Sequence, residues 1–451
     1  MQSKTEVIRT MIHKALKYNK IHTLAFALIM AFMVSISGVF ADTDKSSKKQ
    51  DHNTHQNDDN AVTTHEDDAH ASTDGHEGEE HSDEHKAYDP AEFAMHHIQD
   101  ANEWHLWGDK AVPLPIITYS KSDGLFTGMS SMFKHGHKAK KGYVMNHGRL
   151  MKVQDPSFPK DEVEVHGIKE KKVEIISKGE NGNPLKDDDG NVITTEVAKY
   201  FASVNGKDYE VSRSGFVDFS ITKNVFSMIL VALIMGFLFI KVARSYKSRE
   251  GKAPKGLQSF FEPLIVFVRD EIAKPNLGKH SDKYMPYLLT VFFFIWILNM
   301  LGQVPIFPGA ANVTGNIAVT AVLAVITFVL TQLAGTKHYW SHTFLPPVPK
   351  WLYPIMVPVE VAGLFIKPMA LMIRLFANIS AGHILVLSLV GLIFIFSNAG
   401  ESLAGGLGGA AVAVPFTLFI MCIELLVAFL QAFIFTILSA VFIGLAIDEG
   451  H

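Results

Sequence analysis

The sequence predicts an all-α polytopic membrane protein that carries a small extracytoplasmic N-terminal insert, mostly β or irregular. Two observations predict this class. The 451 residues divide near residue 222 into a half rich in Lys, Asp, Glu and His and a half of long apolar runs. Those runs approach or exceed the ~20 residues that cross a bilayer. We therefore expect an extracytoplasmic segment over residues 90–222 and a membrane domain over residues 223–451.

Overall composition excludes several classes of protein. A formal net charge of −4 argues against a nucleic-acid surface, so no nucleic-acid partner is expected. The single cysteine, Cys422, excludes an intrachain disulfide framework and a cysteine-cluster metal site, and its apolar surroundings predict a small core residue. The sequence contains no GxxxxGK[ST] loop, so neither nucleotide chemistry nor a cofactor is expected in this chain.

Residues 1–41 have the layout of a secretory signal peptide. Lys14, Lys17 and Lys20 precede the apolar stretch 24–39, and small residues follow it up to Ala41. The alternative is a first transmembrane helix, but the stretch is at the short end of the ~17 to 25 residues that a span needs. We expect cleavage after Ala41.

Residues 42–89 are predicted to be a disordered leader. They contain almost no aromatic or branched apolar residue, so they cannot bury enough surface to offset the entropy of ordering. Their histidines could bind a divalent metal loosely, but no fixed ligand spacing recurs, which favours a solvated acidic segment. These histidines are His52, His55, His65, His70, His76, His81 and His85.

Residues 90–222 have a more globular composition that includes several aromatic residues. Apolar and charged residues alternate over 162–166, which is typical of a half-exposed strand. The strand-like pieces 172–177 and 191–196 flank turn-rich sequence, so they predict a small hairpin. No catalytic constellation occurs here, and we interpret the segment as an extracytoplasmic cap.

The C-terminal half contains five apolar runs, which predict five membrane passages. They lie at residues 225–240, 286–301, 317–333, 355–396 and 412–447. Six basic residues follow the first run between Lys241 and Lys255, whereas the loops 302–316 and 397–409 contain no Lys or Arg. The positive-inside rule places the basic loop in the cytoplasm. An odd number of passages then leaves the N-terminal segment outside and His451 inside, in agreement with the signal peptide.

The last two runs are too long for upright helices. As one helix, residues 355–396 would measure ~60 Å, about twice the hydrocarbon thickness. Pro358 and Pro368 offer breaks or kinks early in the run, and the remainder still requires a strong tilt. Two long, steeply tilted C-terminal helices are therefore expected, and such helices suit contact with a curved partner.

Ionisable residues inside the apolar runs are candidates for function, because each costs roughly 2.5 to 3.5 kcal/mol to insert. Glu360, Lys367 and Arg374 are spaced by seven residues, which keeps them on one helix face, and Asn378 continues that stripe. Glu360 and Lys367 could instead be a pair that reaches water at the cytoplasmic end. Arg374 lies deeper among apolar neighbours and keeps its proton, so it requires an anion, which we expect another chain to supply.

Three more polar residues lie within the last two runs. His383 lies nine residues after Arg374, about half a turn away on the opposite side of the helix. Glu424 and Gln431 are seven residues apart and share a face of the last helix.

Three segments carry a resemblance to a known family. Residues 373–383 read IRLFANISAGH, residues 430–435 read LQAFIF, and residues 298–305 read LNMLGQVP. Together they resemble subunit a of the membrane sector of bacterial F-type ATP synthases, a likeness that spans roughly residues 282–449. Residues before 223 are additions that this pattern does not explain.

The resemblance implies a function. It implies a non-catalytic stator subunit that conducts protons through two offset half-channels to and from the carboxylates of a rotating c-ring, so that the proton gradient drives ATP synthesis. It implies that Arg374 faces those carboxylates and that Asn378 and Gln431 lie close to it. The implied partners are the c-ring, the peripheral-stalk subunit b, the remaining synthase subunits and the lipid bilayer. The implied location is the cell inner membrane, with a periplasmic N-terminal segment and a cytoplasmic C-terminus.

One departure from the family pattern concerns His383 and Glu424. Many bacterial relatives carry an acid at the first position and a histidine at the second, so the two residue types are exchanged here. An acid and an imidazole remain, which suits a proton relay because histidine titrates near neutrality. We expect the two side chains to meet in the periplasmic-side channel, with Glu360 as a further member of the proton path.

Two other classes of function remain as alternatives. A secondary ion transporter also places charges in discontinuous helices, but five passages do not divide into paired repeats. A membrane-anchored metal scavenger would use the histidine-rich leader but would leave Arg374 without a role. Whether the transported ion is a proton or sodium depends largely on the ring.

Overall fold

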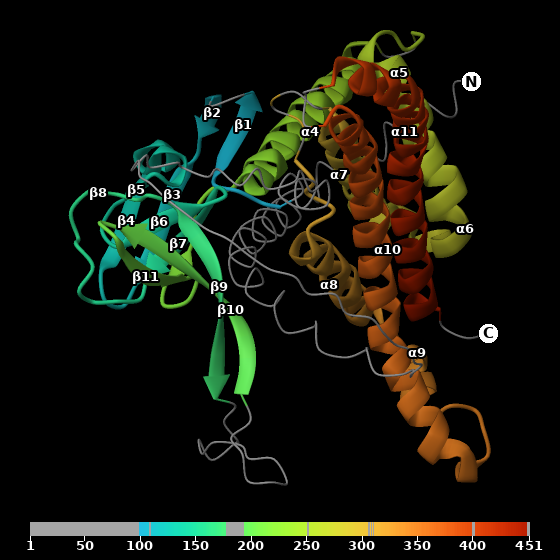
Figure 1. Cartoon of the computed structure of the whole chain (residues 1–451). Helices are drawn as coiled ribbons and strands as arrows, with labels where there is room; N and C mark the ends of the chain where they lie inside the picture. Colours follow the sequence, from blue (N-terminus) through green and yellow to red (C-terminus); the bar gives the residue numbers. More distant parts are fainter. Residues whose placement is uncertain are drawn as a thin grey trace, which may run out of the picture.

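The computed structural model describes residues 99–107, 110–176, 194–249, 252–304, 307, 309, 311–398 and 402–448. Among these residues a β-rich N-terminal part lies beside a group of long helices (Figure 1). The predicted class, a mostly helical polytopic membrane protein with a β insert, is confirmed. The predicted signal peptide and the histidine-rich leader lie outside the described residues, as does the turn between the two hairpin strands.

The β part consists of small antiparallel sheets. The five-stranded sheet has the order β6-β7-β11-β10-β9, and the three-stranded sheet has the order β12-β3-β4. Two further pairs are β1 with β2 and β5 with β8. The strands are β1 (Glu103–Trp107), β2 (Lys110–Pro113), β3 (Pro115–Ser120), β4 (Gly124–Met129), β5 (Lys138–Ala139), β6 (Tyr143–Asn146), β7 (Arg149–Val153), β8 (Val163–Glu164), β9 (Ile168–Ile176), β10 (Thr194–Val204), β11 (Lys207–Ser212) and β12 (Val217–Asp218).

The predicted hairpin is present but longer than expected. β9 and β10 pair in antiparallel register, with Val173 opposite Val197. The alternating stretch 162–166 forms only the short strand β8, because its single partner β5 has two residues. Phe126 stacks on buried Tyr143 with ring centroids 5.2 Å apart, so this part has a core of its own.

The first helix, α4 (Lys223–Ser248), is joined tightly to the β part. The Asn224 N–H donates to Asp100 Oδ1 at 3.1 Å, and the Lys223 N–H donates to the Ala101 carbonyl oxygen at 2.9 Å. Burial raises the pKa of the Asp100 carboxyl, although the hydrogen bonds from Thr222 and Asn224 and the charge of Lys223 oppose that rise. The carboxylate caps the helix N-terminus, which fixes the insert to the membrane domain.

Five helical stretches within the described residues are long and apolar enough to cross a membrane. They are Lys223–Ser248, Leu257–Gln303, Ile317–Ala334, Lys350–Phe396 and Leu403–Ile447. The second is built from α5 (Leu257–Phe267), the π-helical turn η3 (Val268–Ala273), α6 (Lys274–Leu277), the short turn η4 (Gly278–His280) and α7 (Ser281–Gln303). The remaining helices are α8 (Ile317–Ala334), α9 (Lys337–Phe344), α10 (Tyr353–Phe396) and α11 (Leu403–Ile447).

Two helix boundaries differ from the sequence prediction. The helical segment before α7 was not predicted, and its charges are matched locally: Arg269 donates two hydrogen bonds of 2.9 Å to the Asp270 carboxylate. α11 begins at Leu403, nine residues before the predicted start at residue 412. Its glycine-rich first turns lie close against the end of α10, where a Cβ on Gly409 would meet the Phe396 side chain at 3.1 Å. Close backbone approach explains why glycine is tolerated in this helix.

α10 is one continuous helix. Pro358 and Pro368 both lie inside it, so neither proline ends it. Its 44 residues give a length of about 66 Å, so it must incline strongly or project beyond the ~30 Å hydrocarbon layer. α10 and α11 run side by side over much of their length (Figure 1).

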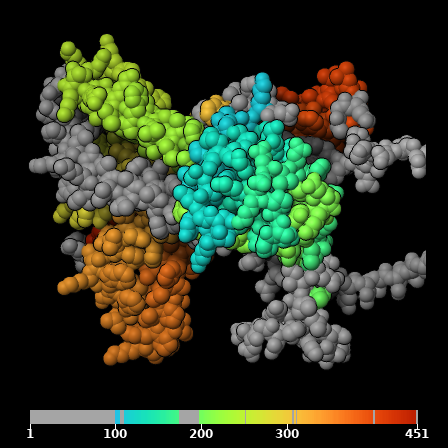
Figure 2. All heavy atoms as spheres, turned by 90° about the vertical axis from the view of Figure 1, so that its left-hand side faces the viewer, coloured from blue at the N-terminus to red at the C-terminus, as the bar shows by residue number. Residues whose placement is uncertain are grey.

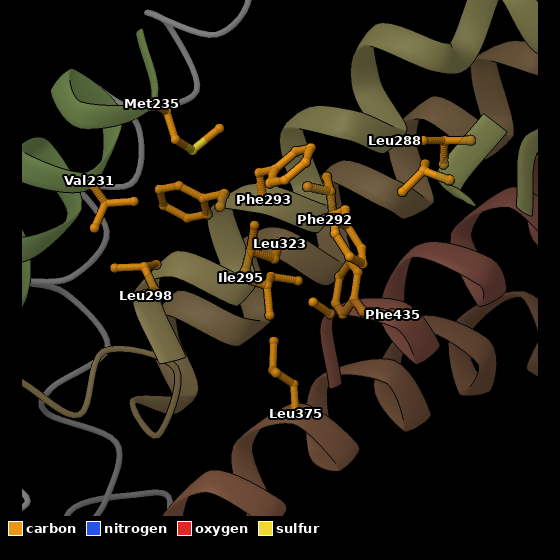
Figure 3. Packing of buried hydrophobic residues seen from close by; sticks show 14 of the residues in the cluster. Val231, Met235, Leu288, Phe292, Phe293, Ile295, Leu298, Leu323, Leu375 and Phe435 are labelled. Carbon is orange, nitrogen blue, oxygen red and sulfur yellow. The ribbon is translucent and has the colours of Figure 1, made fainter. Parts of the chain in front are cut away.

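The helical core lies between α4, α7, α8 and the inner faces of α10 and α11. Figure 3 shows Phe293 of α7 beside Met235 of α4, and Phe292 beside Phe435 of α11. In the apolar windows of α10 and α11 only 11% and 22% of residues are buried, against 33% to 50% in the other three spans. Cys422 lies on the exposed side of α11, so the prediction of a core cysteine is wrong for this chain.

Candidate functional site

The packing of α10 determines where Arg374 lies. Leu371, Leu375 and Ile379 recur every four residues and are buried against the other helices. Arg374 and Asn378 each precede a buried residue by one position, about 100° around the helix, and both are exposed in this chain. The two residues therefore occupy the outer face of α10, away from the core.

Arg374 has no anionic partner in the part of the chain that the structure describes. Neither an ion pair nor a hydrogen bond joins its guanidinium to another described residue, and this includes Asn378 and Gln431. Gln431 is buried, with 3% of its surface exposed, so it does not share the outer face of Arg374. A cation in an apolar helix is costly unless an anion accompanies it, and no described residue provides that anion.

The structure brings His383 and Glu424 together across the α10–α11 contact. His383 Nδ1 lies 3.8 Å from Glu424 Oε1, and their side chains are 18% and 14% exposed. The same His383 nitrogen lies 3.1 Å from the Ile379 carbonyl oxygen. At this separation the two atoms are too far apart for a hydrogen bond, so a proton would pass between them through a water or after a small side-chain movement.

Gly382, which carried no role in the sequence prediction, makes this contact possible. A Cβ at this position would lie 2.1 Å from Glu424 Oε1 and 3.0 Å from its Cδ. The Glu424 carboxylate therefore occupies the space that any other residue at position 382 would need. Sequence spacing could not reveal this, because the requirement comes from a helix about forty residues further along the chain.

We expect Gly382→Ala to displace the Glu424 carboxylate from His383 and to slow ATP-driven proton pumping several-fold, because the added Cβ would take the place of the carboxylate oxygen. Gly363→Ala is the matched control on the same helix, because its Cβ would meet nothing within 4 Å. Shortening the acid with Glu424→Asp in the Gly382→Ala protein should recover part of the rate. Equal pumping by the Gly382 and Gly363 variants in membrane vesicles would contradict the steric argument.

α7 supports the same region with two amides, of which Asn299 is buried and Gln303 is partly buried. Gln303 Nε2 donates to the Glu424 carbonyl oxygen at 2.8 Å, and Asn299 Nδ2 lies 3.4 Å from the Ala428 carbonyl oxygen. Thr314 in turn donates its hydroxyl to Asn299 Oδ1 at 2.6 Å. These contacts fix α11 beside α7 at the level of Glu424. Asn299 and Gln303 belong to the motif at residues 298–305, but the sequence predicted no role for either residue.

Glu360 and Lys367 do not pair with each other. Within the described ranges no ion pair joins them, Lys367 is exposed and Glu360 is partly exposed. The charge of Glu360 instead affects Tyr339 of α9. Burial raises the pKa of the Tyr339 hydroxyl, and the negative charge of Glu360 raises that pKa further. These residues form a polar group separate from His383 and Glu424.

The described residues contain no cluster of three or more His, Cys, Asp or Glu side chains that could hold a metal ion. The leader histidines considered above lie outside those residues.

Within the described ranges, five apolar helical spans define a polytopic membrane protein, and one of them carries on its outer face an arginine with no ion-pair partner among the described residues. The family model described as ATP synthase A chain matches residues 225–444. ATP synthase subunit a of Chloroherpeton thalassium is 44% identical over 248 residues, which cover 52% of this chain and 71% of that protein. The Myxococcus xanthus subunit a is 47% identical over 255 residues, covering 55% and 79%. The chain belongs to the ATP synthase subunit a family, whose members are membrane components of the synthase and not catalytic subunits.

The β part has a separate match. A family described as a domain of unknown function (DUF8433) matches residues 93–176. The assignment of the chain to the ATP synthase subunit a family therefore rests on its membrane half.

Proposed function

We propose that this chain is the stator subunit that conducts protons through two half-channels to and from the carboxylates of a c-ring. The observation that carries the proposal is the position of Arg374, on the outer face of a long apolar helix and without an anionic partner among the described residues. An anion that moves past this face would meet an unpaired, permanent cation. ATP-driven acidification of vesicles that carry an Arg374 variant tests the proposal.

Electrostatics explains how Arg374 would act. A ring carboxylate within ~4 to 6 Å of the guanidinium is stabilised in its ionised form, so it releases its proton there. A second positive charge beside the guanidinium is repelled at low dielectric, so protons cannot leak directly between the half-channels. Asn378 lies one helical turn further along the same outer face and would orient the passing carboxylate through its amide. Gln431, which is buried behind this face, would support the contact from α11.

His383 and Glu424 form the inner part of the inlet half-channel in this proposal. Their 3.8 Å separation and partial exposure support a relay that receives protons from the periplasm. Glu360, near the opposite end of α10, would belong to the proton path on the cytoplasmic side. The amides of Asn299 and Gln303 would hold α11 in register for the relay.

The orientation follows from the charge of the loops. The basic cluster from Lys241 to Lys255, which includes the last turns of α4 and the segment after it, belongs in the cytoplasm by the positive-inside rule, so the β part is periplasmic and the C-terminus is cytoplasmic. In this proposal residues 90–222 are a periplasmic segment and residues 223–451 are the membrane domain in the cell inner membrane. Subunit b and the remaining synthase subunits would bind the same membrane complex.

We expect the leader to be removed after Ala41 and residues 42–89 to be dispensable for proton pumping. Their composition cannot support a packed core, so their deletion should leave assembly unchanged. N-terminal sequencing of the mature protein checks the cleavage site. Vesicles that carry the 42–89 deletion should acidify at the native rate, and loss of the assembled complex would contradict this expectation.

A further inference from the structure

Trp104 of β1 packs in the core of the membrane domain, although it belongs to the β part. Only 4% of its surface is exposed, and it lies in the same apolar cluster as Phe292 of α7 and Phe435 of α11. The two apolar clusters within the β part contain residues of that part alone. Figure 2 shows the β part in front of the helical domain, with helices visible on both sides. Trp104 therefore connects the insert with the helices behind it.

The Trp104 ring contacts both α4 and the loop that follows α7. Its centroid lies 5.8 Å from that of Phe226 in α4 and 5.2 Å from that of Phe307 in the loop, and both pairs meet edge to face. Phe226 and Phe307 also stack on each other, with their centroids 6.1 Å apart. Each aromatic pair of this kind is worth about 0.5–1.5 kcal/mol beyond the area that it buries. The insert therefore holds Phe307 in place shortly after the end of α7.

The later part of the same loop rests on the helices around the proposed proton relay. Ser380 of α10 donates its hydroxyl to the Gly315 carbonyl oxygen at 3.3 Å. Ser380 lies about one helical turn before His383. Thr314 donates its hydroxyl to Asn299 of α7, whose own amide reaches the backbone of α11. The loop therefore links the insert to α10 close to the relay.

We propose that the β insert clamps the loop after α7 against the His383–Glu424 relay, with Trp104 as the positioning residue. The inference rests on the proposed function, in which this pair receives protons from the periplasm. The insert is already attached to α4 through the cap that Asp100 provides, so the distinct effect of Trp104 is on the loop. Proton transfer across the 3.8 Å contact needs a bridging water or a small side-chain movement, so a loop that moves away from α10 would slow it.

Hydrogen exchange of the assembled complex tests the clamp. The Val313 and Asn316 amides donate to carbonyl oxygens within the loop at 2.9 and 3.1 Å. The Gly315 amide donates to Asn312 Oδ1 at 3.1 Å. These amides should exchange slowly in the unmodified protein and several-fold faster in Trp104→Leu, because the loop opens more often once the indole is removed. Exchange within α8 should stay unchanged.

Two further variants control for loss of folding. Phe307→Ala removes the same contact from the loop side, and Phe307 is already 39% exposed, so the substitution leaves no large cavity. It should raise exchange at the same amides, and it decides the question alone if Trp104→Leu does not assemble. Phe133→Leu is the matched control, because Phe133 is fully buried in a cluster formed by the β part alone. It should leave exchange in the loop unchanged.

ATP-driven pumping tests whether the clamp positions the relay. Trp104→Leu and Phe307→Ala should each pump several-fold more slowly than the unmodified protein. The two substitutions together should be little slower than the worse single variant, since both remove one contact. Trp104→Phe keeps an aromatic ring and should recover most of the rate, and Phe133→Leu should pump normally.

A covalent tether separates positioning of the loop from folding of the insert. Cys422 is exposed, so the background is Cys422→Ser, into which Trp104→Cys and Phe307→Cys are introduced together. A short bifunctional methanethiosulfonate joins the two thiols in the purified complex. Tethering should restore pumping after reconstitution into liposomes, and reduction of the tether should abolish it again. A merely destabilised insert would respond to neither step.

The outcomes separate the clamp from the proposed function. Unchanged exchange in the loop of both Trp104→Leu and Phe307→Ala would show that the insert does not hold the loop, and this inference would fail alone. Faster exchange with pumping at the native rate would show that the loop does not position the relay, which also overturns the inference. If an Arg374 variant pumps normally, the proposed function itself fails, whatever the exchange measurement shows.

Discussion

Replacing Arg374 with lysine is expected to abolish coupled proton transport although the formal charge is kept. Lysine places a compact ammonium on a flexible stem, which cannot reproduce the planar guanidinium fork. The outer face of α10 offers no second cation within a helical turn of Arg374 that could replace it. A loss of about 3 kcal/mol of carboxylate stabilisation corresponds to a rate roughly 100-fold lower.

Membrane vesicles provide the measurement for this substitution. ATP-driven acidification should fall to the level of vesicles without synthase, while the amount of assembled complex stays constant. Arg244→Lys is the matched control, because it makes the same exchange at an exposed position near the C-terminal end of α4. Acidification near the native rate by vesicles that carry Arg374→Lys would contradict the proposed role of the guanidinium.

Exchanging His383 and Glu424 should be milder than changing either residue alone. His383→Glu places two carboxylates across the 3.8 Å contact, and Glu424→His places two imidazoles there. Two like groups at this separation cannot both carry a charge at low dielectric, so each single variant should lose most of its pumping. The exchanged protein again has one acid and one imidazole. Position 382 remains glycine, which keeps space for a side chain from α11.

A double-mutant cycle separates this interaction from general damage. ATP-driven pumping is measured over a range of pH in the four proteins, with the assembled complex quantified in each. We expect the exchanged protein to recover at least ~10-fold over the worse single variant, which corresponds to a coupling of at least about 1.4 kcal/mol plus the loss measured in the milder single variant. If the free-energy effects of the two single substitutions simply add in the exchanged protein, the residues act independently and the assignment of a relay is wrong.

The membrane helices could be predicted from the sequence because the ability to cross a bilayer depends on the length of an apolar run, a local property. The same holds for the strands β9 and β10, which carry their own alternation and turn residues. The helical segment before α7 escaped prediction because its charges are matched locally, as in the Arg269–Asp270 pair. The sequence did not predict the start of α11, because close packing against α10 stabilises the glycine-rich first turns of this helix.

The family, the five apolar runs and the seven-residue spacing that places Arg374 on one stripe of α10 can all be derived from the sequence. Helical periodicity predicts which residues share a face, but it does not predict which face packs inward. That Leu375 faces the core and Arg374 faces outward is seen only in the folded chain, because it depends on the apolar surfaces of the helices that pack on α10, mainly α8 and α11. The contact of Glu424 with Gly382 has the same origin. It requires two helices separated in sequence to meet closely, which no local pattern encodes.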